Sequence, residues 1–418
     1  MDFIRVHGGT TLQGKVKVQG SKNAALPILA ATLLVQGPVL LKNCPKISDV
    51  DGMILLLQTL GCSARWERDA LCVCTDHYDK ARLPDETVGA MRSSVFLLGA
   101  ILARKGEAIL GWPGGCVIGK RPIDLHIKVL TKMGVRFRET DEGICAIAEN
   151  GLHGISVELD FPSVGVTENL VMAATAADGL TRIKGAAKEP EVTALCEFLK
   201  KCGAFISGIG TDILEIRGGS KLHGGEFRIP SDRIVAGTYL FAGLAAGGSI
   251  LLEEAPTEHM QEVLRVIRQM GGSVTETAGG LYAQFTGHPQ NPLFLKTDVY
   301  PGFPTDLQSM AVAAGCVGEG DFVVQETIFE NRFRIIKALE SMGGRICRID
   351  DGSVRIIGRG GLRGAEVEAL ELRGGAALIV AALGAKGETV ISGRRYIERG
   401  YENICRDLRE LGARIVSG

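Results

Sequence analysis

The sequence lacks several features that mark specialised classes of protein. Its 418 residues carry a net charge of only −1, and aromatic residues make up 5% of them. Balanced charge excludes a broad electrostatic attraction to nucleic acid or to an anionic membrane surface. The eleven cysteines are an odd number and form no CxxC pair, and the seven histidines are scattered. We therefore expect a reduced protein without a structural metal.

Long hydrophobic stretches are also missing. The longest mainly apolar run, 24–35, covers about half of the roughly 20 residues that a membrane-spanning helix needs, and it contains Pro27. The opening residues, Met-Asp-Phe-Ile-Arg-Val, show no basic segment followed by an apolar one, so no signal peptide is expected. These absences predict a soluble, cytoplasmic protein with no membrane insertion and no nucleic-acid partner.

Glycine, by contrast, is abundant. The 56 glycines are about 13% of the chain, against roughly 7% in ordinary proteins. No G-X-Y period exists, which excludes collagen, and a hydrophobic content of 45% is too high for a glycine-rich linker protein. The composition therefore indicates a compact protein with many tight turns or many close backbone approaches.

The sequence contains six copies of one pattern, roughly 70 residues apart. Each copy has a Leu, Met or Cys followed by a glycine suited to the left-handed position after a helix, at Gly61, Gly134, Gly203, Gly271, Gly343 and Gly412. Amphipathic outer helices are predicted before these glycines at 49–60, 122–133, 190–202, 258–270, 331–342 and 400–411. Earlier in each copy, segments rich in Ala and Gly predict buried helices at 24–34, 94–103, 167–177, 234–244, 307–314 and 376–383.

Each copy is therefore predicted as strand, buried helix, strand, outer helix and hairpin. The sixth copy ends after one strand, 414–416, and we expect the N-terminal strand 3–6 to be its partner. The fold class predicted is α/β, an inside-out α/β barrel of two lobes with three copies each. The first lobe would span 21–230 and the second 1–20 plus 231–418, with a substrate cleft between them. A stacked solenoid is the alternative, although its usual period of about 20–50 residues is shorter.

The most distinctive segment is a loop at 112–126 that contains Cys116. Three glycines and a proline form the loop, and Arg121–Asp124 would open a helix whose N-terminus, beside two cations, suits an anion. Nearby cations favour the thiolate of an accessible cysteine. The alternative is that Cys116 is simply one of eleven mostly buried cysteines; its loop favours a reactive role.

Other candidate residues recur at junctions between strands and helices. The cations there, with one adjacent amide, are Lys22 and Asn23, Arg92, Arg332, Arg373 and Arg399. Any one of these cations is best interpreted as a solvated charge, but their recurrence at such junctions indicates a site for a substrate with several negative charges. Asp306 is either the N-cap of a helix beginning at Leu307 or a general base whose pKa the neighbouring cations tune.

At these residues the chain resembles the UDP-N-acetylglucosamine 1-carboxyvinyltransferases, also called UDP-GlcNAc enolpyruvyl transferases. The resemblance runs through the whole chain in order, and the cysteine loop is its most specific part. The matching motifs are Gly20–Pro27, Pro113–Cys116 with Gly119 and Arg121-Pro122, Phe303–Asp306, Phe329–Phe333 and Arg399–Glu402. The resemblance implies transfer of enolpyruvate from phosphoenolpyruvate to the sugar 3′-hydroxyl with release of phosphate, the first committed step of peptidoglycan synthesis, without a cofactor.

The resemblance also implies roles for individual residues. Cys116 would donate a proton to C3 of phosphoenolpyruvate and form a covalent adduct with it, and Asp306 would be the base for the sugar hydroxyl. The phosphate would be held by Lys22, which also counts as catalytic, with Arg121 and Arg399, and the carboxylate by Arg332 and Arg373. The nucleotide sugar would be held by Asn23, Arg92, Arg121, Pro122, Ile123, Asp124, Leu125, Ser163, Val164, Gly165, Asp306 and Ile328.

Two positions depart from the family pattern. Phe161 stands where some members place a lysine, and Glu371 stands where an aspartate is common. Both bear on affinity more than on the type of reaction. Two alternative functions remain: an enolpyruvyl transferase acting on shikimate 3-phosphate, against which the cysteine loop argues, and a non-catalytic regulator that binds nucleotide sugar. The regulator would be expected to lack Cys116, Lys22 or Asp306, and all three are present.

Overall fold

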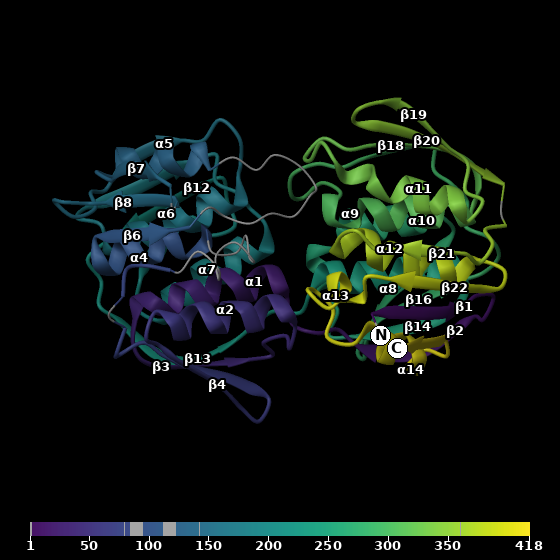
Figure 1. Cartoon of the computed structure of the whole chain (residues 1–418), viewed down its shortest axis with the longest axis horizontal. Coiled ribbons are helices and arrows are strands. Elements are labelled where there is room, and N and C mark those ends of the chain that lie inside the picture. Colours follow the sequence, from purple (N-terminus) through teal and green to yellow (C-terminus); the bar gives the residue numbers. More distant parts are fainter. Residues whose placement is uncertain (1, 79, 84–94, 112–122, 142, 360) are drawn as a thin grey trace. The chain divides into compact units, whose positions relative to one another are not determined.

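The computed structural model describes residues 2–78, 80–83, 95–111, 123–141, 143–359 and 361–418 (Figure 1). The described residues form two compact units, which we treat separately. The first unit extends from Gly20 to Pro230, and the second combines the residues up to Gln19 with Ser231–Gly418. Each unit has its own hydrophobic core.

The first unit contains, in chain order, α1 (Lys22–Ala31), η1 (Thr32–Leu34), β3 (Val35–Lys42), α2 (Ser48–Thr59), β4 (Ser63–Glu67), β5 (Ala70–Cys74), α4 (Leu97–Lys105), β6 (Glu107–Leu110), α5 (Asp124–Lys132), β7 (Arg136–Thr140), β8 (Gly143–Ile147), β9 (Ser156–Glu158), α6 (Val164–Ala176), β10 (Leu180–Lys184), α7 (Pro190–Lys201), β11 (Phe205–Ser207), β12 (Ile213–Arg217) and β13 (Leu222–Arg228).

The second unit contains β1 (Phe3–His7), β2 (Leu12–Lys17), α8 (Arg233–Ala246), β14 (Gly248–Glu253), η3 (Thr257–His259), α9 (Gln261–Gln269), β15 (Gly272–Thr277), β16 (Gly280–Phe285), β17 (Phe294–Lys296), η4 (Thr305–Leu307), α10 (Gln308–Val317), β18 (Glu319–Gln325), η5 (Arg332–Ile335), α11 (Ile336–Ser341), β19 (Ile346–Asp350), β20 (Ser353–Arg359), β21 (Glu366–Glu368), α12 (Leu372–Gly384), β22 (Glu388–Ser392), α13 (Arg394–Ile397), α14 (Ile404–Glu410) and β23 (Arg414–Ser417).

The six repeat glycines all lie at helix ends, as predicted. Each of α2, α5, α7, α9, α11 and α14 ends two residues before its glycine. The six glycines have φ between 91° and 109°, a left-handed conformation that a side chain opposes. At Gly343, an added Cβ would meet nothing within 4 Å, so the backbone angle alone accounts for glycine there.

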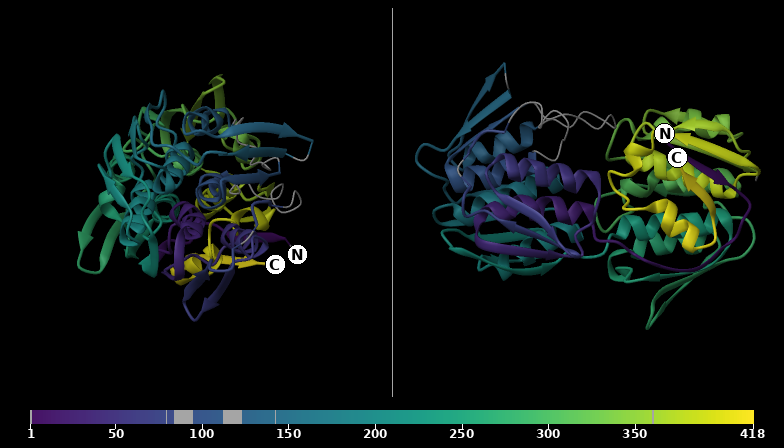
Figure 2. Two further views of the ribbon diagram at one scale, coloured as in Figure 1. Left: turned by 90° about the vertical axis from the view of Figure 1, so that its left-hand side faces the viewer. Right: turned by 60° about the horizontal axis from the view of Figure 1, so that its bottom comes forward.

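The buried helices lie inside each unit and the strands lie outside them (Figures 1 and 2). In the second unit every residue of α10 is buried, and α8 and α12 are buried over nearly their whole length. The strands around them alternate between buried and exposed residues, so only one face of each sheet contacts the core. Glycines inside the helices permit close packing: a Cβ on Gly243 would lie 2.2 Å from the Phe285 ring. This arrangement is the predicted inside-out α/β fold, and it excludes the solenoid.

The sheets follow the predicted unit. In three copies, the strand before the buried helix pairs in parallel with the strand after it: β9 with β10, β17 with β18 and β21 with β22. Each outer helix then leads into an antiparallel hairpin strand. Two strands near the boundaries of the units pair with a sheet other than that of the helix that follows them in the chain. β2 precedes α1 in the sequence but pairs with β14 in the second unit, whereas β13 precedes α8 but pairs with β3 in the first.

The two ends of the chain complete one sheet of the second unit. β1 lies between β22 and β23 and is antiparallel to both, with Val6 opposite Thr389 on one side and Ile415 on the other. The last copy of the pattern therefore obtains its missing strand from the other end of the sequence, where we expected it.

Several predicted helix boundaries were wrong. The segment 331–342 is divided into η5 and α11, and Phe333 inside η5 has non-helical angles. The last helix begins at Ile404 rather than at 400, because the Asn403 side chain caps it by accepting a hydrogen bond from the Arg406 N–H. Within the described ranges, no helix is both long enough and apolar enough to span a membrane.

Candidate active site

In the second unit, Asp306 joins two arginines from different elements. Asp306 lies in η4, Arg332 begins η5 and Arg373 is the second residue of α12. One carboxylate oxygen, Oδ1, accepts a hydrogen bond from Arg332 Nη2, and Oδ2 accepts one from Arg373 Nη2 at 3.0 Å. Asp306 is not the helix N-cap that the sequence left open: it lies inside η4, whose N-cap is Pro304, and the N-cap of α10 is Leu307.

Both arginines of this cluster are buried cations. Their side chains are 2% and 3% exposed, and that of Asp306 is 24% exposed. Burial by itself lowers the pKa of Arg373, but the charge of Asp306 and the Tyr401 phenol oxygen raise it above the ordinary arginine value. Arg373 therefore remains charged, and the site holds positive charge where solvent has limited access.

Glu371 and Tyr401 hold Arg373 in place. The Glu371 carboxylate caps α12 by accepting hydrogen bonds from the N–H groups of Arg373, at 2.8 Å, and Gly374, and it lies 3.9 Å from Arg332 Nη1. Arg373 Nη1 donates to the Tyr401 hydroxyl at 3.4 Å. The unusual glutamate at 371 thus performs a capping role for which an aspartate would also be suited.

The remaining predicted residues of the second unit lie on loops. Ile328 is half-buried, and its N–H donates to Glu326 at 2.8 Å. Arg399 is half-buried in the segment between α13 and α14.

In the first unit, Lys22 and Asn23 open α1. The Ser21 hydroxyl oxygen caps this helix by accepting a hydrogen bond from the Ala24 N–H at 3.3 Å. Lys22 Nζ donates to Asp49 Oδ2 at 3.1 Å, and both side chains are largely buried, 13% and 7% exposed. Asn23 is half-buried beside Lys22. A partly buried cation at the start of a helix is suited to an anionic group.

Two further predicted segments of the first unit are adjacent. Asp124 and Leu125 open α5, and Ser163 precedes α6, which begins with Val164 and Gly165. A Cβ on Gly165 would lie 3.4 Å from Nε2 of His126, so the two helix starts meet there. Ile123, Leu125, Ser163, Val164 and Gly165 are half-buried and Asp124 is exposed, so these residues line a surface that a ligand can reach. Phe161 is 46% exposed next to them.

Four predicted residues, Arg92, Cys116, Arg121 and Pro122, lie outside the described residues. The structure also identifies residues that the sequence did not: Asp49, Thr305, Glu326 and Tyr401 each bind a predicted site residue or its loop. Thr305 and Tyr401 lie in the motifs Phe303–Asp306 and Arg399–Glu402, and this was the only indication in the sequence that they belong to the site. Asp49 binds Lys22, and Glu326 binds Thr305, through contacts between separate elements.

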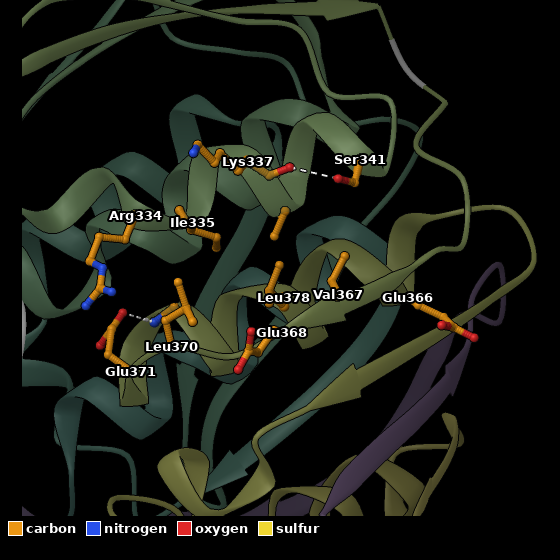
Figure 3. A pocket seen from close by; sticks show the side chains of 12 residues that line it. Arg334, Ile335, Lys337, Ser341, Glu366, Val367, Glu368, Leu370, Glu371 and Leu378 are labelled. Carbon is orange, nitrogen blue, oxygen red and sulfur yellow. Dashed lines mark hydrogen bonds between the residues drawn. The ribbon is translucent and has the colours of Figure 1, made fainter.

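A pocket of about 260 Å³ lies in the second unit between α11, α12 and β21 (Figure 3). Apolar side chains such as Leu370 and Leu378 line it, together with charges of both signs, including Arg334, Lys337 and Glu366. No residue predicted to bind substrate lines this pocket, and its mixed charges favour no class of ligand. Among the described residues, no group of three His, Cys, Asp or Glu side chains could hold a metal ion.

Comparison with known proteins identifies the family of the chain. The family model described as EPSP synthase (3-phosphoshikimate 1-carboxyvinyltransferase) matches residues 6–408. The UDP-N-acetylglucosamine 1-carboxyvinyltransferase of Oleidesulfovibrio alaskensis is 44% identical over 99% of both chains. Enzyme 2 of that name from Caldanaerobacter subterraneus is 42% identical over 100% of this chain and 99% of its own.

Solved structures show the same fold. The enolpyruvyl transferase NikO from Streptomyces tendae has a TM-score of 0.89 at 25% identity, covering 99% of this chain and 98% of its own. An EPSP synthase from Acinetobacter baumannii has a TM-score of 0.76 at 19% identity over 100% of this chain and 99% of its own, which bears on the fold alone. The fold, the family model and the relatives agree, and the chain belongs to the enolpyruvyl transferases, a family of carboxyvinyltransferase enzymes.

Proposed function

We propose that the chain transfers enolpyruvate from phosphoenolpyruvate to the 3′-hydroxyl of UDP-N-acetylglucosamine. The names of relatives that are 42–44% identical over nearly the full length support this proposal. The observation in the structure that best supports it is the pair of buried arginines at Asp306, because phosphoenolpyruvate brings a carboxylate that needs such partners.

The reaction would proceed by addition and elimination. Asp306 would take the proton of the sugar hydroxyl, whose oxygen adds to C2 of phosphoenolpyruvate while Cys116 delivers a proton to C3. Loss of a proton from C3 would then restore the double bond as the C2–O bond to phosphate breaks and phosphate leaves. A covalent adduct between Cys116 and phosphoenolpyruvate belongs to the same proposal.

Binding of phosphoenolpyruvate would change the partners of Asp306. Arg332 and Arg373 would bind its carboxylate, and both already bind the Asp306 carboxylate. The substrate carboxylate would therefore compete with Asp306 and release it to act as a base. The phosphate would be held by Lys22, Arg121 and Arg399.

The nucleotide sugar has its own set of proposed contacts. The proposed contacts are Asn23, Arg92, Arg121, Pro122, Ile123, Asp124, Leu125, Ser163, Val164, Gly165, Asp306 and Ile328. We also propose domains at 21–230 and at 1–20 plus 231–418, a cytoplasmic location, and a role in peptidoglycan synthesis and so in cell shape and division.

Phosphate release from phosphoenolpyruvate tests the proposal. The native chain should release phosphate with UDP-N-acetylglucosamine and not with shikimate 3-phosphate, the acceptor of the alternative transferase. The Cys116→Ala variant should be much slower, and equal rates would overturn the proton-donor role. A native chain that releases no phosphate with either acceptor, but still binds the nucleotide sugar, would favour the regulator.

A further inference from the structure

Glu326 is a buried carboxylate for which the proposed reaction has no role. It follows β18 directly and is 6% exposed. Its backbone N–H donates to the Gly352 carbonyl oxygen at 2.7 Å, which holds the residue to the turn between β19 and β20. A buried carboxylate is costly unless hydrogen bonds compensate for its lost hydration, so its partners show what it supports.

One oxygen of Glu326 closes the turn that carries Ile328. Oε1 accepts hydrogen bonds from the backbone N–H groups of Ile328, at 2.8 Å, and Phe329, at 3.1 Å. The Phe329 ring lies against the Arg332 guanidinium, with its centroid 5.3 Å away. This oxygen thus orients a turn that contains one proposed sugar contact and supports one proposed carboxylate contact.

The other oxygen of Glu326 acts on Arg332 through Thr305. Oε2 accepts a hydrogen bond from the Thr305 hydroxyl at 2.9 Å. The Thr305 oxygen in turn accepts one from Arg332 Nε at 3.2 Å. Thr305 also directly precedes Asp306, so the same interaction bears on the position of the proposed base.

The negative charge of Glu326 sets the direction of these bonds. An ionised carboxylate only accepts, so Thr305 must give it its single proton and keep its lone pairs for Arg332 Nε. A glutamine at 326 could instead donate from its amide N–H₂ to the Thr305 oxygen, which would bring a second donor beside Arg332 Nε and leave the hydroxyl proton without its acceptor. The two N–H groups of the turn at Ile328 need only an acceptor oxygen at position 326, which glutamine also has. The orientation of Arg332 through Thr305 needs the charged carboxylate of Glu326.

We propose that Glu326 is a positioning residue that orients Arg332 and the turn at Ile328 for substrate binding. This inference rests on the proposed function, because the groups it orients are those assigned to phosphoenolpyruvate and to the nucleotide sugar. Glu326 itself contacts neither substrate in this scheme.

Steady-state kinetics with both substrates test the proposal in the full chain. Glu326→Gln should lower kcat/KM for phosphoenolpyruvate about 10- to 100-fold, the effect of disturbing one hydrogen bond to a charged group. Thr305→Val should have a similar effect, whereas Thr305→Ser, which keeps the hydroxyl, should remain close to the native chain. Because both variants disturb one path, the double variant should lose much less than the product of the two single losses.

A buried carboxylate elsewhere in the second unit is the matched control. Asp407 is 5% exposed and accepts a hydrogen bond from the Tyr239 hydroxyl at 2.6 Å. Asp407→Asn should lower the melting temperature and leave both KM values unchanged. Glu326 is merely structural if Glu326→Gln lowers the melting temperature without changing either KM. It is also merely structural if the loss of kcat/KM in the double variant equals the product of the losses of Glu326→Gln and Thr305→Val. A native chain without activity would instead overturn the proposed function, and this role with it.

Discussion

Replacing Asp306 by alanine tests the charge balance of the candidate site. In the native chain its carboxylate binds two arginine side chains that are 2% and 3% exposed. Asp306→Ala removes the anion and leaves both guanidinium groups in place. Arg332 keeps Glu371 at 3.9 Å and Thr305 at 3.2 Å. Arg373 keeps a hydrogen bond to the Tyr401 hydroxyl and the charge of Asp232, but it loses the carboxylate bound to it and bears most of the loss.

The expected loss of stability follows from this geometry. Removing one partner of a buried ion pair costs about 3–5 kcal/mol. Because the Asp306 side chain is 24% exposed, water reaches the vacated position, and we expect the lower end, about 3 kcal/mol. For a unit of roughly 200 residues this corresponds to a fall in Tm of about 6–12 °C.

An added oxyanion should restore much of the lost stability. Phosphate or phosphoenolpyruvate can take the place of the carboxylate between the two arginines, and a ligand at 100 times its Kd stabilises a protein by about 2.7 kcal/mol. Both anions should therefore raise the Tm of Asp306→Ala more than that of the native chain. Activity should stay about 100- to 10,000-fold lower, because an added anion does not replace a positioned base.

Differential scanning calorimetry with and without the anions provides the measurement. Asp321→Ala is the control, since Asp321 pairs with Arg355 on the surface, where the two side chains are 45% and 53% exposed and the pair contributes little. The reasoning is refuted if Asp306→Ala melts with the native chain, or if phosphate raises the Tm of both by the same amount.

Two further predictions concern glycine and cysteine. Gly343→Ala should lower the free energy of unfolding by about 1–2 kcal/mol, because residue 343 has a left-handed φ angle. Gly20→Ala should lower it clearly more, because the added Cβ would lie 1.8 Å from the Asn43 carbonyl oxygen. Equal urea midpoints for the two variants would contradict this prediction. Burial raises the pKa of Cys316 to about 12, so iodoacetamide at neutral pH should label exposed Cys347 and spare Cys316 in the folded chain. The ordinary pKa of a thiol is about 8.5, so the stability that the neutral Cys316 thiol contributes is present below about pH 8.5 and is lost as the pH rises toward its pKa in the folded chain. Labelling of Cys316 and Cys347 at one rate would contradict the burial argument.

The repeat architecture was predictable because its signals are local. A glycine at Gly271 or Gly412 records a backbone angle that few other residues adopt, and the amphipathic segment before it records a helix with one buried face. Neither signal depends on distant contacts. The helix beginnings were less predictable, because caps such as Asn403 and breaks such as Phe333 differ from copy to copy.

The candidate site was predictable only in part. Motifs identified Asp306, Arg332 and Arg373 as candidates, but they gave no indication that one carboxylate binds both arginines. The roles of Asp49 and Glu326 had no signal in the sequence, because Lys22 and Thr305, the partners that show these roles, are brought to them by the fold.

By itself, then, the sequence determined the number of copies, the order of helix and strand within each, and the residue types available for chemistry, since these depend on backbone angles and hydrophobic periodicity along short segments. Tertiary structure alone decided which charges meet. Asp306 and Arg373 are far apart in the chain and come together because η4 and the start of α12 pack in the same core. The sequence predicted lobe boundaries near residues 20 and 230, but the strand partners at these crossings, β14 for β2 and β3 for β13, are decided by contacts between distant segments.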